Sequence, residues 1–93
     1  MSQDLPHLIW VDCEMTGLDI NKDALVEIAV LVTDAQLNVL GEGVDLVIKC
    51  EQGKLDGMDD FVKNMHTSSG LITQIPNGTT LASADDAIWD LRN

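Results

Sequence analysis

Three stretches of the chain carry the apolar and β-branched residues typical of strands, over residues 8–15, 25–33 and 39–49. The first stretch is apolar on both of its alternating faces, which is typical of a strand inside a sheet with a layer on each side. Residues 34–38 contain Asp and Asn and predict a hairpin turn between the second and third strands. Two glycines within residues 41–43 predict a bulge or twist in the third strand.

The second half of the chain changes to helical spacing. Apolar residues recur at steps of three and four and predict one amphipathic helix over residues 55–66. The Ser-Gly pair at 69–70 ends that helix, and residues 71–75 predict a further helical turn. Ser83 and Asp86 have capping-box spacing, so a last helix begins at Ser83 or a few residues earlier. The apolar stripe of this last helix comprises Leu81, Ala84, Ile88 and Leu91.

Composition and charge narrow the class of protein. A length of 93 residues allows one small domain, and a hydrophobic fraction of 45% is typical of a globular chain. No apolar run can span a membrane, and the first residues lack the basic region of a signal peptide. The two cysteines give neither a disulfide framework nor a metal-binding spacing, so we expect a cytoplasmic protein with no membrane contact. A net charge of −11 argues against a basic surface for long nucleic acids and favours short substrates held at one or two phosphates.

Two carboxylates end the first predicted strand. Asp12 and Glu14 project from the same face of a strand, about 6.6 Å apart along it, whereas Cys13 faces the other side as an ordinary buried thiol. Paired oxygen ligands favour a hard cation such as Mg²⁺ or Mn²⁺, and the alternative is two solvated acids at a strand end. We interpret Glu27, the polar residue of the second strand, as a strand-edge acid near solvent rather than a metal ligand.

The segment between the first two predicted strands matches part of the pattern of an EF-hand calcium loop but lacks two of its required residues. Asp19, Asn21 and Asp23 occupy the first, third and fifth positions of an EF-hand loop. The sixth position requires Gly and holds Ala24, and the twelfth requires Glu and holds Val30. Without the turn glycine and the bidentate acid, we do not expect calcium to bind here.

A longer pattern surrounds the two strand-end acids. The sequence Asp-x-Glu-x-Thr-Gly-Leu over residues 12–18 resembles the first motif of the DEDD-type 3′→5′ exonuclease family, and its surroundings resemble the oligoribonucleases of that family. The resemblance runs from about residue 8 to the end of the chain. The segments that continue it in order are residues 27–29, 32–34, 37–40, 65–66 and 69–71.

The resemblance implies an α/β protein with an RNase H-like exonuclease fold. The chain would hold the N-terminal half of that fold, a three-stranded antiparallel sheet plus helices, as a single partial exonuclease domain over residues 1–93. In this family two metal ions are held by four acids, and a histidine acts as the general base. Asp12 and Glu14 match the first two acids as catalytic and metal-binding residues, with Asp12 shared by both ions and Glu14 on the side of the attacking water. The other acids and the base belong to the later half, after the last residue of this sequence.

Substrate-binding residues are also implied by the resemblance. Met15, Thr16 and Gly17 would line the pocket of the 3′-nucleotide, and Leu18 would wedge between the two bases. The alternative for Leu18 is a loop residue folded back on the core. Phe61 and His66 would stack on a terminal base of the substrate. The alternative for Phe61 is a core residue of its helix. The alternative for His66 is a residue at the helix C-terminus that the helix dipole stabilises.

The function implied is a 3′→5′ exoribonuclease that degrades very short oligoribonucleotides, dinucleotides above all, to nucleoside 5′-monophosphates by two-metal hydrolysis with Mg²⁺ or Mn²⁺. A homodimer is expected of the family. Because the later acids and the base are absent, we expect this chain alone to be inactive. The alternative is a non-catalytic fragment that binds metal and dinucleotide or that dimerises. We also expect the first strand to have a free edge, because the later strands that would flank it are absent, and the fragment to be weakly stable.

Overall fold

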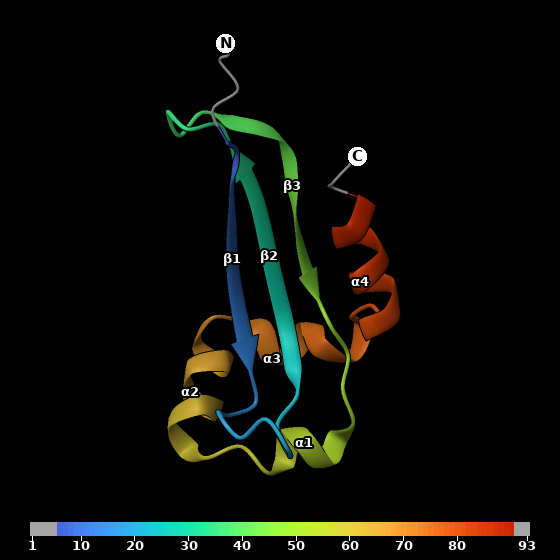
Figure 1. The fold of residues 1–93 in the computed structure, drawn as a ribbon. Coiled ribbons are helices and arrows are strands. Elements are labelled where there is room, and N and C mark those ends of the chain that lie inside the picture. Colours follow the sequence, from blue (N-terminus) through green and yellow to red (C-terminus); the bar gives the residue numbers. More distant parts are fainter. Residues whose placement is uncertain (1–5, 91–93) are drawn as a thin grey trace.

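The computed structural model describes residues 6–90, which form one antiparallel sheet and a set of short helices (Figure 1). The strands are β1 (Leu8–Met15), β2 (Leu25–Thr33) and β3 (Val39–Val47), and they lie in the order β1-β2-β3. Each strand is antiparallel to its neighbour. The predicted α/β class, with a three-stranded antiparallel sheet and helices, is therefore confirmed.

One carboxylate organises the hairpin between β2 and β3. Asp34 Oδ1 accepts hydrogen bonds from the backbone N–H groups of Gln36 and Asn38, both at 2.9 Å. Farther along, the pairing of β2 with β3 shifts its register just after Val30. Gly43 lies opposite this shift with a φ of +69°, and a Cβ there would lie 2.7 Å from the carbonyl oxygen of Val30. The predicted hairpin turn and bulge are both confirmed.

The third strand ends at Val47, earlier than the predicted residue 49. The chain leaves the sheet at this point to pair with the segment that precedes the last helix. Ile48 forms a single parallel bridge with Thr79, and the N–H of Lys49 donates to the carbonyl oxygen of Thr79 at 2.9 Å. Gly78 permits this close approach, because a Cβ there would lie 2.7 Å from the backbone nitrogen of Lys49.

The single helix predicted over residues 55–66 is wrong, since the structure contains two helices there. The first, α1 (Gln52–Asp56), ends at Gly57. The second, α2 (Asp60–Ser68), begins after Asp59, whose backbone is extended and whose carboxylate accepts from the N–H three residues later at 2.8 Å. This N-cap stabilises a new helix start within an apolar pattern that would otherwise be continuous.

The remaining helices follow the predicted order. The further turn predicted over residues 71–75 is present as α3 (Leu71–Gln74) and the 3₁₀ turn η1 (Ile75–Asn77). The last helix, α4 (Leu81–Asp90), begins two residues before Ser83. Its cap is Thr80 rather than Ser83, because Thr80 Oγ1 accepts from the N–H of Ser83 at 3.1 Å.

The apolar stripe predicted on α4 is only partly buried. Ala84 is buried, Ile88 is half-buried and Leu81 is exposed, whereas Leu91 lies outside the described residues. Among residues 6–90, none of the helices is both long enough and apolar enough to cross a membrane.

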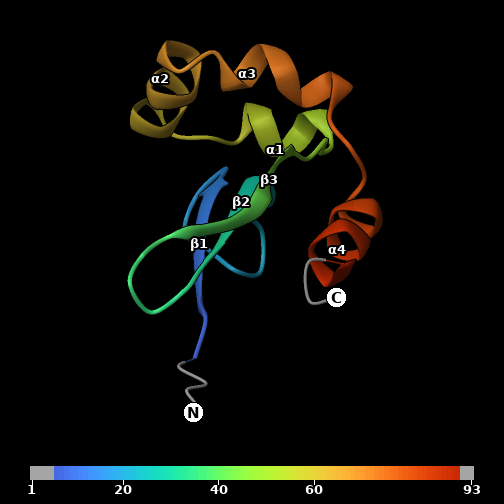
Figure 2. The same cartoon turned by 90° about the horizontal axis from the view of Figure 1, so that it is seen from above.

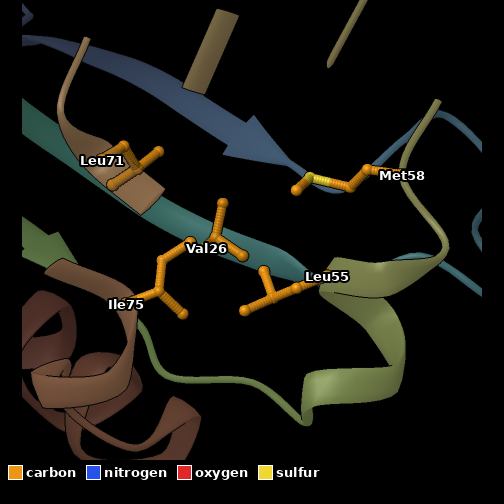
Figure 3. Close-up of a cluster of buried hydrophobic side chains, with 5 residues drawn as sticks. All are labelled: Val26, Leu55, Met58, Leu71 and Ile75. Carbon is orange, nitrogen blue, oxygen red and sulfur yellow. The ribbon is translucent and has the colours of Figure 1, made fainter. Parts of the chain in front are cut away.

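The main hydrophobic cluster lies at one end of the sheet, where α1, α2 and α3 gather (Figures 1 and 2). Figure 3 shows its five buried side chains, which point toward one another from β2, from the helices and from the segment between α1 and α2. They are Val26, Leu55, Met58, Leu71 and Ile75. The cluster holds the start of β2 and the end of β3, through Val26 and Val47, against the helices. The rest of the sheet extends away from this core, and the molecule measures 53 × 24 × 24 Å.

Strand β1 has a free edge in the described part of the chain. It pairs with β2 on one side, and the sheet order leaves its other side without a neighbouring strand. The apolar side chains of Ile9, Trp10 and Val11 are exposed on this strand. The free edge expected from the sequence is therefore confirmed.

Candidate active site

The two predicted metal-binding acids lie near the end of β1 that meets the helices. Asp12 pairs in register with Ala29 of β2, and Glu14 pairs with Glu27. Because residues two apart in a strand share a face, Asp12 and Glu14 project from the same side of the sheet. Asp12 is exposed and Glu14 is half-buried, so both carboxylates remain accessible. Cys13, on the other face, is half-buried rather than buried as predicted.

Two further carboxylates lie beside this pair. A hydrogen bond with Asp45, burial, and the charges of Asp45, Glu14 and Asp12 together raise the pKa of Glu27 from 4.5 to about 7. Glu27 lies on the middle strand rather than at an edge of the sheet, and its side chain is half-buried, with part of it open to solvent as predicted. The interpretation that it is not a metal ligand stays a prediction. Four acidic side chains on adjacent strands therefore share a region in which negative charge is unfavourable.

Two of these acids, Asp12 and Asp45, border a groove across the sheet. Its volume is about 630 Å³, and its lining includes Asp12 and Asp45 together with the side chains of Trp10 and Leu31. The indole N–H of Trp10 donates to Thr33 Oγ1 at 3.1 Å, which fixes the ring along the sheet. The groove therefore combines carboxylate oxygens with apolar walls.

The carboxylates of Asp12 and Glu14 are the kind of ligand that binds a divalent cation, but two carboxylates are too few to complete a metal site. Carboxylate oxygens are the ligands that Mg²⁺ and Mn²⁺ prefer. A cation would offset the charges of the neighbouring acids, which add to the hydrogen bond with Asp45 and to burial in raising the pKa of Glu27. Within residues 6–90, however, no group of three or more His, Cys, Asp or Glu side chains has the arrangement of a metal site. Asp12 and Glu14 are the two residues of this chain that the sequence motif assigns to such a site, and that assignment stays a prediction.

The turn after β1 is fixed by an internal hydrogen-bond network. Thr16 is buried, and its hydroxyl donates to Asp23 Oδ1 and accepts from the N–H of Ala24, both at 2.9 Å. Asp23 Oδ2 also accepts from the N–H of Asp19 at 3.0 Å. The hydrogen bond from the Asp19 backbone and then that from the Thr16 hydroxyl lower the pKa of Asp23. A Cβ on Gly17 would lie 2.4 Å from Asp23 Oδ2, so this turn requires glycine.

The same network accounts for the apparent calcium pattern. Asp19 Oδ1 accepts from the N–H of Asn21 at 2.9 Å, and both carboxylate oxygens of Asp23 accept bonds within the loop. The carboxylates therefore stabilise the loop that carries the Thr-Gly turn. The spacing of three polar residues reflects loop geometry.

The side chains assigned to substrate differ in exposure. Leu18 is 91% exposed, so the alternative of a leucine folded back on the core is wrong. Met15 is also exposed, beside the buried Thr16. Phe61 on α2 is 77% exposed, which excludes its interpretation as a core residue. These apolar side chains are open to solvent near the end of β1 and on α2, and their roles toward a nucleotide stay predictions.

His66 lies differently from the other proposed substrate residues. Its ring is 1% exposed, and Nε2 lies 2.7 Å from the backbone carbonyl oxygen of Met15. It belongs to the last turn of α2, as the interpretation of a helix C-terminal residue requires. The structure thus joins α2 to the end of β1 through His66, a contact that the sequence did not predict.

Two residues of the site were missed or misjudged from the sequence. The sequence pattern does not point to Asp45, nor to its hydrogen bond with Glu27. Their proximity depends on the register of the β2–β3 pairing, in which Ala29 lies opposite Asp45. The bulge at the glycines of β3 determines that register, so residue spacing alone could not have identified the pair.

Comparisons with known proteins agree with the motif. A family model described as exonuclease (RNase T) matches residues 9–77. The chain is 59% identical over 83 residues to the oligoribonuclease of Cutibacterium acnes, a match that covers 89% of this chain and 41% of that relative. It is 60% identical over 86 residues to the oligoribonuclease of Corynebacterium glutamicum, with 91% of this chain and 39% of the relative covered. For the oligoribonuclease of Mycobacterium tuberculosis the identity is 52% over 88 residues, with 94% and 41% covered.

The matched relatives are much longer than this chain, which spans about 40% of their length. The resemblance noted at residues 12–18 therefore extends over most of the chain, and the chain corresponds to only part of each relative. Because the family model matches most of its residues, this chain belongs to the exonuclease (RNase T) family.

Proposed function

We propose that this chain supplies the first two metal-binding acids and part of the substrate pocket of a 3′→5′ exoribonuclease. The substrates are very short oligoribonucleotides, dinucleotides above all, and the products are nucleoside 5′-monophosphates. Residues 1–93 are then part of a single exonuclease domain, and the later acids and the general base come from a further polypeptide segment. Alone, the chain binds without cutting. The complete enzyme acts in cytoplasmic RNA degradation as a homodimer.

The observation that carries the proposal is the placement of Asp12 and Glu14 side by side at the end of β1. Next to them, Glu27 has a pKa raised to about 7 by neighbouring carboxylates and burial. Negative charge of this density is costly without a cation. The oxygen donors favour Mg²⁺ or Mn²⁺, and Asp12 and Glu14 are the residues of this chain that would hold such ions. When bound, two divalent ions supply the positive charge that activates a water and stabilises the leaving 3′-oxygen.

The exposed residues beside the acids account for the preference for short substrates. The turn from Met15 to Leu18 lines the 3′-nucleotide, and Leu18 separates the two bases. Phe61 stacks on a terminal base, an interaction that contributes roughly 1–3 kcal/mol and tolerates any base. His66 belongs to this pocket through its contact with Met15. The net charge of −11 disfavours a long polyanion, so binding rests on the few groups at this end of the sheet.

Metal binding is the first test. Mn²⁺ titrated into the ¹⁵N-labelled chain is expected to broaden the amide signals of residues 12–14 first, because paramagnetic relaxation falls steeply with distance. Asp12→Asn removes one anionic ligand with little change of shape and is expected to abolish this selective broadening. Asp86→Asn, the same change on an exposed residue of α4, is the matched control and should behave as the unsubstituted chain. Equal broadening at acidic residues throughout the chain would contradict the assignment.

Dinucleotide binding and turnover then separate the two candidate functions. A 5′-labelled RNA dinucleotide is incubated with the chain and Mn²⁺, with Asp12→Ala beside it. Binding without hydrolysis supports the proposed half-site. Turnover that Asp12→Ala abolishes would instead show that two copies complete one another. If the chain binds metal but no dinucleotide, the substrate part of the proposal fails and a dimerisation fragment remains.

A further inference from the structure

A buried histidine joins α2 to the end of β1. His66 Nε2 lies 2.7 Å from the carbonyl oxygen of Met15, which is 51 positions away in the sequence, and the ring is 1% exposed. A carbonyl oxygen can only accept a hydrogen bond, so Nε2 must carry the proton. The contact therefore specifies the tautomer of His66 as well as its position.

The carbonyl group of Met15 lies where the regular pairing of β1 with β2 is interrupted. The register of β1 with β2 shifts between Glu14 and Met15, so regular pairing is disturbed next to the second acid. Thr16 resumes the pairing through its N–H, which donates to the carbonyl oxygen of Ala24 at 2.9 Å. The hydrogen bond from His66 thus satisfies a strand-end carbonyl between Glu14 and the Thr-Gly turn.

The segment 15–17 is consequently held from two sides. On one side, the hydroxyl of Thr16 is bonded to Asp23 and to the N–H of Ala24 in the loop after β1. On the other side, His66 reaches Met15 from α2. Removal of the His66 bond would therefore take away the hydrogen bond by which α2 holds this segment.

The burial of His66 also separates it from Phe61. Base stacking requires an accessible ring face, and Phe61 is 77% exposed on the same helix. The ring of His66 is enclosed and cannot offer a face to a base in this conformation. The two residues therefore have different tasks.

We propose that His66 is a positioning residue, whose Nε2–H group holds the Met15–Gly17 segment in place beside Asp12 and Glu14. Its effect on a nucleotide is indirect and passes through the backbone of Met15. The part of this inference that concerns nucleotide affinity rests on the proposed function. The tautomer and the order of the segment do not, since both are measured without nucleotide.

The tautomer is read directly by long-range ¹H–¹⁵N correlation spectra of the imidazole rings in the unsubstituted chain. We expect His66 to be protonated at Nε2 and to exchange that proton slowly with water. His7, the chain's other histidine and an exposed one, is the internal reference and should exchange fast. A His66 ring that is protonated at Nδ1 only, or that exchanges as fast as His7, would overturn the proposal.

Substitutions then separate positioning from simple support of the fold. His66→Leu keeps apolar volume and removes the donor, whereas His66→Gln retains an N–H group near the position of Nε2. We expect His66→Leu to broaden or shift the amide signals of residues 15–17 and to weaken dinucleotide binding about tenfold, with both effects largely restored in His66→Gln. His7→Gln is the matched control and should leave both readouts unchanged.

The outcomes distinguish this inference from the proposed function. If the unsubstituted chain binds no dinucleotide but shows the expected tautomer and the donor-dependent order of residues 15–17, the positioning role stands and the proposed function fails. If dinucleotide binds and His66→Gln is as impaired as His66→Leu at residues 15–17, the hydrogen bond is not responsible and the positioning role is refuted. If His66→Leu loses all dispersed amide signals, the variant is unfolded. The proposal is then decided by the tautomer of His66 in the unsubstituted chain and by the order of residues 15–17 in His66→Gln.

Discussion

Removal of one negative charge from the middle strand should stabilise the protein at neutral and alkaline pH. Glu27 is half-buried beside Asp45, Glu14 and Asp12, and its pKa is raised from 4.5 to about 7. A raised pKa means that the folded state binds the proton more tightly than the unfolded state. The free energy of unfolding therefore decreases as the pH rises from about 4.5 through about 7, and it stays lower above that range.

The size of the effect follows from the two pKa values. The difference between 4.5 and about 7 corresponds to about 3 kcal/mol at 1.36 kcal/mol per pKa unit. Because the side chain is only partly buried and solvent screens its charge, we expect about 1–2 kcal/mol. Glu27→Gln removes the titration and keeps an N–H donor for the carboxylate of Asp45. At pH 8 the variant should therefore be about 1–2 kcal/mol more stable than the unsubstituted chain, or melt roughly 5–10 °C higher, whereas at pH 5 the two should be nearly equal.

The assay is urea and thermal unfolding at pH 5, 6, 7 and 8 in EDTA, followed by tryptophan fluorescence and circular dichroism. Both proteins contain the same other ionisable groups, so the difference between the two curves isolates Glu27. Glu51→Gln is the matched control, since Glu51 is exposed and its side chain makes no capping bond to α1. Parallel stability curves for Glu27→Gln and the unsubstituted chain between pH 5 and 8 would refute the reasoning.

Three further changes test the core, the bulge and the acidic site. Ile75→Ala creates a cavity in the main cluster and should lower the free energy of unfolding, measured in urea, by about 2–5 kcal/mol. Leu81 is exposed, so Leu81→Ala should change that free energy by less than about 0.5 kcal/mol. Equal effects of the two substitutions would contradict the assignment of Ile75 to the core. Gly43→Ala combines a φ of +69° with a contact to the carbonyl oxygen of Val30 and should cost about 1–3 kcal/mol in the same assay, so a neutral result would rule out the strained bulge. Saturation with Mg²⁺ should lower the pKa of Glu27, followed by carboxyl ¹³C shifts, and an unchanged titration would argue against a cation beside it.

The strands were predictable because their signals are local. β1 and β2 begin and end where the apolar alternation does, and the Asp34 carboxylate of the hairpin accepts the expected bonds from backbone N–H groups. The one helix expected over residues 55–66 failed because Asp59 offers a side-chain cap in the middle of the pattern. Apolar spacing continues across that break, since Leu55 and Met58 both reach the same cluster without belonging to one helix. A periodicity of burial does not require a continuous helix.

Within the candidate site, only the residues that lie on the same strand, β1, could be predicted to lie together. Asp12 and Glu14 share a face because they are two residues apart, and this needs no knowledge of neighbouring strands. The Glu27–Asp45 pair depends on a cross-strand register that the bulge of β3 determines. The bond from His66 to Met15 depends on how α2 docks, which follows from the packing of the main cluster. Long-range geometry of this kind has no signature in residue spacing.

The stability of the chain is unevenly distributed along β1, and this bears on where a ligand can act. The end of β1 near Met15 is anchored by the turn network and by His66 from α2, whereas the exposed residues at its start pair only with β2 within the described residues 6–90. Regions with few buried contacts open at a lower free energy than the core does. The two acids therefore lie between an anchored turn and a weakly supported strand edge. A second polypeptide that paired with that edge would add backbone hydrogen bonds on the side where Asp12 has the least support, so it would stabilise the fold and order the acids through the same contact.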